Sequence, residues 1–135
     1  MSFDLLLRFI ITIGIIFFGL GVYWFVNQRL LARAQNQTSS LPEPLQKKPT
    51  IVYFTTPDCV PCKTVQRPAL QKLIDLFGEK LHVIEIDATE RPDLAIGWGV
   101  MSVPTTFLLD EKGMAKYVNN GVARLEKLLE QVKNL

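Results

Sequence analysis

The chain has 135 residues, a formal net charge of +2 and only two cysteines, Cys59 and Cys62. This length allows one domain, and two cysteines exclude a scaffold stapled by several disulfides. Residues 1–48 hold five Lys and Arg against two Asp and Glu, whereas residues 49–135 hold ten against eleven. The second part is nearly neutral and lacks a basic face that could grip phosphates, so we expect no nucleic-acid partner.

The first expected element is an N-terminal membrane anchor, residues 1–34, with a transmembrane helix at about residues 5–28. Residues 9–26 (FIITIGIIFFGLGVYWFV) carry no charge. At about 1.5 Å per residue, such a run nearly spans a hydrocarbon core about 30 Å thick. Tyr23 and Trp24 lie where interfacial aromatic residues are common, which favours a membrane span over a buried soluble helix.

A cleaved signal peptide is the alternative to a retained anchor. Ala32-Arg33-Ala34 has the small-x-small form that a signal peptidase favours. The apolar stretch is long for a signal peptide, however, and Arg29 and Arg33 lie where the segment before a cut is normally uncharged. We therefore favour a retained, single-pass anchor in the cell membrane.

The side of the membrane on which the rest of the chain lies is predicted from flanking charge. Arg8 precedes the apolar run, whereas Arg29, Arg33, Lys47 and Lys48 follow it. Positive charge marks the cytoplasmic flank of a span. The count favours a cytoplasmic C-terminal domain, with an extracytoplasmic domain as the alternative.

Residues 35–49 (QNQTSSLPEPLQKKP) are rich in Gln, Ser and Pro and have no apolar period. They predict a flexible tether between the anchor and a domain of residues 50–135. Within that domain, hydrophobic periodicity and turn residues predict seven elements. In chain order these are a strand at 50–55, a helix at 59–77 kinked by Pro68, a strand at 81–87, a short helix at 92–98, two hairpin strands at 105–109 and 114–118, and a final amphipathic helix from about Val122. The order gives an α/β fold with a mixed four-stranded sheet and flanking helices.

The motif with chemical content is Cys59-Val60-Pro61-Cys62, directly after the first strand and at the start of its helix. A CxxC pair in that context predicts a redox-active dithiol. The helix start favours the Cys59 thiolate, Lys63 adds a favourable charge and Asp58 opposes it. We expect a moderately lowered pKa for Cys59, with Cys62 less exposed and acting as the resolving thiol.

A metal site is not expected from the same residues. Zinc needs four ligands, and the chain offers two cysteines and a single histidine, His82. A structural disulfide across so short a loop would stabilise the fold little. We therefore expect neither a metal nor another cofactor.

These features resemble the thioredoxin family over Thr50 to Leu135. The resemblance rests on the strand followed by CVPC and Lys63, the later proline in the same helix, the Val103-Pro104-Thr105 segment, and glycines at 113 and 121. The first strand and helix of a full-length thioredoxin are missing from this span, which leaves the minimal fold. The resemblance implies a cis Pro104 against the dithiol. It further implies that Val103 and Thr105 flank a site for an extended substrate segment, which Gly121 keeps open.

Three positions differ from the usual family pattern and bear on redox tuning. Tyr53 stands where a buried Asp is common, while Asp58 and Thr55 stand where Trp is common. Trp98 falls on a position that is usually aromatic. Without the buried Asp, a water or a hydroxyl must take the proton from Cys62. Tyr53 is a candidate for that role, although a strand tyrosine more often serves only as core.

The sequence therefore predicts a monomeric, membrane-tethered thiol–disulfide oxidoreductase that exchanges electrons with protein disulfides through Cys59 and Cys62. Pro61 before the second cysteine favours a reductase by resemblance to thioredoxins. The electron donor is either a thioredoxin-reductase-like protein or a membrane electron carrier. The alternative function is a non-catalytic thioredoxin-like module that docks extended protein segments at the membrane.

Overall fold

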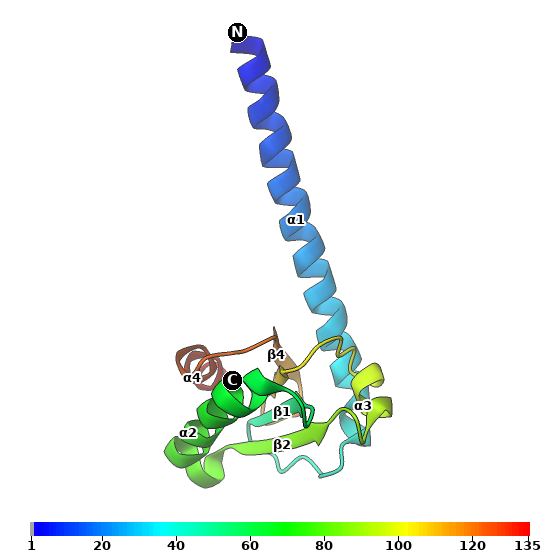
Figure 1. Cartoon of the computed structure of the whole chain (residues 1–135), viewed down its shortest axis with the longest axis vertical. Helices are drawn as coiled ribbons and strands as arrows, with labels where there is room; N and C mark the ends of the chain where they lie inside the picture. The colour runs from blue at the N-terminus through cyan, green and yellow to red at the C-terminus, as the bar shows by residue number, and fades with distance from the viewer. Residues whose placement is uncertain (1) are drawn as a thin grey trace.

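The computed structural model describes residues 2–135. A single long helix, α1 (Ser2–Gln37), extends away from a small α/β domain that contains the rest of the chain (Figure 1). By length and composition α1 is able to cross a membrane, and none of its most apolar stretch is buried in the protein. A signal sequence near an N-terminus has the same properties.

The domain is built on one mixed sheet of four strands in the order β2-β1-β3-β4. Strand β1 (Thr50–Thr55) pairs in parallel with β2 (His82–Asp87) and antiparallel with β3 (Thr105–Leu109), and β3 pairs antiparallel with β4 (Ala115–Asn120). Every residue of β1 and β3 is buried, as their continuous apolar sequences predict for central strands. The predicted α/β fold is confirmed.

Helices cover both faces of the sheet, and the side chains of β1 alternate between them. Ile51 and Tyr53 pack toward α2 (Arg67–Phe77) and α4 (Leu125–Lys133). Val52 and Phe54 point to the other face, where α3 (Pro92–Gly97) and the end of α1 lie. The sheet thus separates two apolar layers, and the dithiol belongs to the first of them.

Three aromatic rings form the centre of the second layer. Trp98 lies 4.9 Å from Phe107 and 5.9 Å from Phe54, measured between ring centroids. All three side chains are fully buried. Edge-to-face and tilted arrangements of this kind are favourable for aromatic quadrupoles, so Trp98 has a packing role at the position where an aromatic residue was expected.

The end of α1 is part of the domain, which differs from the expected domain boundary at residue 50. Leu30 and Ala34 are buried, and Ala34 packs in the same layer as Trp98. The Gln35 side-chain oxygen accepts a hydrogen bond from the Ala115 amide, 3.1 Å away. The helix therefore runs without interruption from the apolar segment onto the sheet.

The segment expected to be a flexible tether is also held against the domain. After the short 3-10 turn η1 (Thr38–Ser40), Leu41 and Leu45 pack against the second apolar layer. Glu43 bonds to the ring of His82 at 2.9 Å, and Lys48 donates to the Glu79 carbonyl at 2.7 Å. The sequence of this segment is polar and contains prolines, and only its two leucines pack against the domain. The contacts were therefore not predictable from its composition.

The helix after the dithiol begins with an irregular turn that the sequence pattern did not predict. Residues of η2 (Cys62–Gln66) form a π-helical turn, and α2 follows with Pro68 in its first turn, where a missing N–H is tolerated. A further 3-10 turn, η3 (Gly78–Lys80), ends the helix. The wider π turn shifts the helix phase, so that Val65 is exposed and Gln66 is fully buried.

Candidate redox-active site

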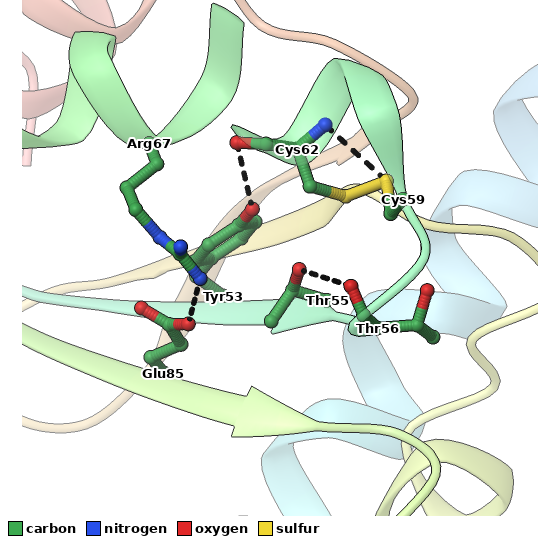
Figure 2. Close-up of polar contacts among 7 residues, drawn as sticks. All are labelled: Tyr53, Thr55, Thr56, Cys59, Cys62, Arg67 and Glu85. Carbon is green, nitrogen blue, oxygen red and sulfur yellow. Dashed lines mark hydrogen bonds and ion pairs between the residues drawn. A yellow bond between two sulfur atoms is a disulfide. The ribbon is translucent and has the colours of Figure 1, made fainter. Parts of the chain in front are cut away.

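The two cysteines form a disulfide at the point where β1 leads into its helix (Figure 2). Their Cα atoms are 5.2 Å apart, within the ordinary range for a disulfide. Cys59 keeps 8% of its surface exposed, whereas Cys62 keeps none. Cys59 is therefore the more exposed residue of the pair and Cys62 the less exposed one, as the sequence predicted.

The backbone at the helix start donates directly to the outer sulfur. The Cys62 N–H lies 3.2 Å from Cys59 Sγ and points at it. The amide of Lys63 donates to the Cys59 carbonyl at 3.3 Å, which begins the helical hydrogen-bond pattern. A fixed N–H donor and the positive end of a helix favour a thiolate at this position.

The residues around the pair are open to solvent. Pro61 has a helical φ of −63° and is exposed, which suits its place in a first helical turn. Val60 is also exposed beside it. Asp58 and Lys63 are exposed, and no hydrogen bond or ion pair of their side chains occurs among residues 2–135. Both charged side chains are therefore solvated rather than paired with another residue.

Tyr53 lies directly beneath the pair on β1 and is fully buried. Its hydroxyl donates to the backbone carbonyl of Cys62 at 3.4 Å (Figure 2). Burial raises the pKa of Tyr53 above its ordinary value, and Glu85 adds to the rise while Thr55 and Arg67 oppose it. With a raised pKa, the Tyr53 hydroxyl keeps its proton and donates a hydrogen bond to the Cys62 carbonyl. Tyr53 therefore anchors the helix start to β1.

The Val103–Pro104 peptide bond is cis, as the resemblance implied. Val103 packs against the apolar cluster that contains both cysteines. The Pro104 carbonyl accepts a hydrogen bond from the Gly121 amide at 2.8 Å, which joins the two loops beside the dithiol. Pro104 itself is buried, whereas Val103 is partly exposed.

Thr105 and Gly121 have structural explanations at these positions. The Thr105 side chain is buried and donates to the Ser102 carbonyl at 2.6 Å, which closes the loop before β3. Gly121 has a φ of +95°, a conformation that side chains rarely adopt. A Cβ placed on Gly121 would meet no atom within 4 Å, so the requirement for glycine that this structure shows is one of backbone conformation.

The thioredoxin family model matches residues 32–134 of this chain. The chain belongs to the thioredoxin family. The matched region begins inside α1, so the thioredoxin domain includes the end of the long helix. The match starts at residue 32 rather than at the expected Thr50, and α1 runs without a break from the apolar segment into the matched region.

Several thioredoxins are similar to the chain in sequence. It is 40% identical over 58 residues to thioredoxin of Bacillus subtilis, covering 43% of this chain and 55% of that protein. It is 30% identical over 108 residues to chloroplastic thioredoxin Y of Oryza sativa subsp. japonica, covering 78% and 63%. A third relative, NADPH-dependent thioredoxin reductase 3 of Arabidopsis thaliana, is 32% identical over 69 residues, 51% of this chain and 13% of that protein. The chain thus spans less than two thirds of the length of each of these relatives.

Solved structures agree with the sequence relatives. The oxidised form of mitochondrial thioredoxin 3 from Saccharomyces cerevisiae has a TM-score of 0.59 at 28% identity, covering 67% of this chain and 82% of that one. Malarial thioredoxin-2, at 22% identity and a TM-score of 0.61 over 65% and 84% of the two chains, shows the shared fold. A thioredoxin-like domain with a close cysteine pair supports thiol–disulfide oxidoreductase activity in general terms.

One residue of this thioredoxin site was missed by sequence reasoning. Gln66 is fully buried, and its side-chain amide bonds in both directions with the backbone of Ala123, accepting from the N–H at 2.8 Å and donating to the carbonyl at 3.1 Å. This pair of bonds fixes the loop after Gly121 against the first turns of the dithiol helix. The only sequence signal was a polar residue next to the apolar stripe, and the π turn that buries it has no clear sequence signature.

Metal binding finds no support at this site. Among residues 2–135, no group of three or more His, Cys, Asp and Glu side chains is close enough to hold an ion. His82, on β2, bonds instead to Glu43.

Proposed function

We propose that this protein is a membrane-tethered thiol–disulfide oxidoreductase that reduces disulfides in other proteins. The observation that carries the proposal is the Cys59–Cys62 disulfide itself, with Cys59 partly exposed and its sulfur held by the Cys62 amide. Membership of the thioredoxin family supports the same chemistry. Val103, beside the pair, is the proposed contact for an extended substrate segment, with Pro104, Thr105 and Gly121 holding its loop in place.

In the reduced protein, the Cys59 thiolate attacks one sulfur of a substrate disulfide. A Cys59–substrate disulfide forms, the substrate S–S bond breaks, and its other sulfur leaves as a thiolate that takes a proton from water. Cys62 then loses its proton and attacks Cys59 Sγ. This step closes the Cys59–Cys62 disulfide and releases the second substrate thiolate, so two electrons pass to the substrate.

The reductase direction is supported by Pro61 before the second cysteine, as in thioredoxins. Each turnover leaves the pair oxidised, so an external donor must return two electrons. A thioredoxin-reductase-like protein fits a cytoplasmic domain, and a membrane carrier fits an extracytoplasmic one. The similarity to an Arabidopsis protein named as a thioredoxin reductase favours the first donor.

Membrane attachment is supported by the apolar, unburied length of α1. We propose that α1 is retained as a single-pass anchor and that positive flanking charge places the domain in the cytoplasm. Protease added to intact cells should leave the domain whole, and protease added to opened cells should remove it. Cleavage in intact cells or spheroplasts would instead place the domain outside.

Insulin reduction by the full chain in detergent micelles tests the activity. The wild type should reduce insulin with dithiothreitol as donor, and Cys59→Ser should abolish turnover because the attacking sulfur is lost. Cys62→Ser should also stop turnover but should accumulate a mixed disulfide through Cys59. Turnover in both variants would contradict the proposal. An inactive wild type that still binds unfolded segments would establish the non-catalytic docking module instead.

A further inference from the structure

A groove lies between the end of the apolar segment of α1 and the loop that follows α3. We define the α1–α3 groove by Val26, Arg29 and Arg33 on α1 and by Ile96 and Met101 across from them. It encloses about 400 Å³. The exposed fractions of Ile96 and Met101 are 77% and 90%, so two large apolar side chains of the domain lie open beside the helix.

We propose that the α1–α3 groove docks onto the bilayer interface, so that the active site serves disulfides held close to the membrane surface. The inference rests on the proposed membrane anchor. Phe25 and Val26 are the last residues of the uncharged run and line the same groove as Ile96 and Met101. If α1 spans the bilayer, the groove lies at the depth where hydrocarbon gives way to headgroups.

The charge of the groove fits this occupant. Arg29 and Arg33 line it, no acidic side chain does so within the described part of the chain, and the Arg29 guanidinium lies 4.8 Å from the Phe25 ring centroid. Cations beside apolar and aromatic groups suit an interface of lipid phosphates over acyl chains. A second copy of this chain would instead bring two more arginines into the groove.

The same loop leads directly to the redox site. Val100 and Met101 also border a smaller hollow lined by Thr56, Ser102 and Val103, next to the loop that bears the dithiol. Figure 1 shows the α3–β3 loop rising beside the base of α1, on the side of the domain from which the long helix leaves. A substrate at Val103 would therefore lie within one loop of the docked surface.

The domain is also unable to turn freely on its anchor. Leu30 and Ala34 of α1 are buried against the domain, and each directly follows an arginine that lines the groove. The helix is continuous through this region, so the orientation of the span sets the orientation of the site. The substrate class that follows is disulfides in juxtamembrane segments of membrane proteins.

Depth in the bilayer can be measured without using the redox activity. Met101→Trp and, as a matched control, Leu76→Trp replace exposed apolar residues on different faces; Leu76 is 66% exposed on α2. The full chain is placed in phosphatidylcholine–phosphatidylglycerol vesicles with or without brominated acyl chains. The brominated chains should quench the tryptophan fluorescence of the Met101→Trp protein more strongly than that of the wild type. They should quench the fluorescence of the Leu76→Trp protein no more than that of the wild type. Equal quenching of both, or of neither, would overturn the proposal.

Substrate preference is then measured with one disulfide peptide, either free or attached to a lipid in the same vesicles. Ile96→Glu and Met101→Glu should each lower the initial rate on the lipid-attached peptide at least about fivefold by weakening docking, and leave the rate on the free peptide unchanged. Leu76→Glu should change neither. If the wild type reduces neither peptide, the proposed function fails; if it reduces both and the groove variants match Leu76→Glu, only the docking inference fails.

Discussion

At the residue scale, the proposed chemistry depends on two chemically identical side chains being placed in unequal surroundings. Cys59 is partly exposed and receives an N–H donor at its sulfur, whereas Cys62 is sealed against β1. The asymmetry follows from position in the first helical turn. A residue that starts a helix faces unpaired amides and solvent, and the residue one turn later faces the sheet.

The Cys59 thiol is expected to titrate below the ordinary cysteine pKa of ~8.5, because a fixed amide and the helix start stabilise its anion. Thiolate absorbance near 240 nm, followed against pH in reduced Cys62→Ser protein, measures it. Asp58→Asn should lower the pKa further by removing an exposed negative charge next to the sulfur. A transition above ~8.5 in the Cys62→Ser protein would show that the helix start does not control this thiol.

Tyr53 should make stability fall at high pH. Its raised pKa means that the folded protein holds the phenolic proton where the unfolded chain, with an ordinary pKa near ~10, has released it. The free energy of unfolding should therefore decline as pH rises above ~10, and Tyr53→Phe should remove that part of the decline. Urea unfolding of both proteins between pH 8 and 11 tests this. If the free energies of unfolding of the wild type and Tyr53→Phe change with pH in parallel, the pKa of Tyr53 is not raised by folding.

At the scale of elements, a π turn decides how the dithiol helix meets the loop before α4. The turn η2 rotates Gln66 inward, and its amide satisfies both backbone groups of Ala123 at once. The loop that carries Gly121 and bonds to Pro104 is thereby fixed to the helix that carries the cysteines. Two segments far apart in sequence are positioned by a single side chain.

Gln66→Leu should lower the free energy of unfolding by about 1–3 kcal/mol, because it leaves the buried N–H and carbonyl of Ala123 without partners. Gln71→Leu, an exposed change on the same helix, is the matched control and should change stability little. Urea unfolding of the oxidised proteins measures both. Equal effects of the two substitutions would show that the Gln66 bonds do not hold the loop.

At the scale of the whole molecule, one continuous helix has two unlike parts. Its first part is apolar on all faces and unburied, and its last turns complete the thioredoxin domain through Leu30 and Ala34. No flexible joint separates the two parts. The domain is thus joined directly to a continuous helix rather than through a flexible linker.

Removal of residues 1–28 should leave a folded domain, since Leu30, Ala34, Leu41 and Leu45 stay in place. Removal of residues 1–49 should cost at least about 3 kcal/mol, because it uncovers the apolar layer around Trp98. Urea unfolding and tryptophan fluorescence compare the two truncations. A 50–135 fragment as stable as the longer one would restore the domain boundary expected from sequence.

Local signals were sufficient for most of the sheet and for the cysteine pair. Continuous β-branched and aromatic runs predict central strands, and CxxC after such a strand predicts the dithiol. Non-local contacts were not predictable in the same way. Leu41 and Leu45 lie in polar, proline-containing sequence, and Gln66 is buried only because a π turn changes the helix phase.

The amino-acid order by itself determined the fold class, the position of the paired cysteines at the start of a helix, and an apolar helix long enough to cross a membrane. Each of these depends on patterns within a few turns or strands. Only the tertiary structure decided that this helix enters the domain, that Gln66 joins the dithiol helix to the Gly121 loop, and that Ile96 and Met101 lie beside the end of the apolar segment. Those features depend on which surfaces meet after the chain has folded, and residues distant in sequence carry no local signal of their eventual contact.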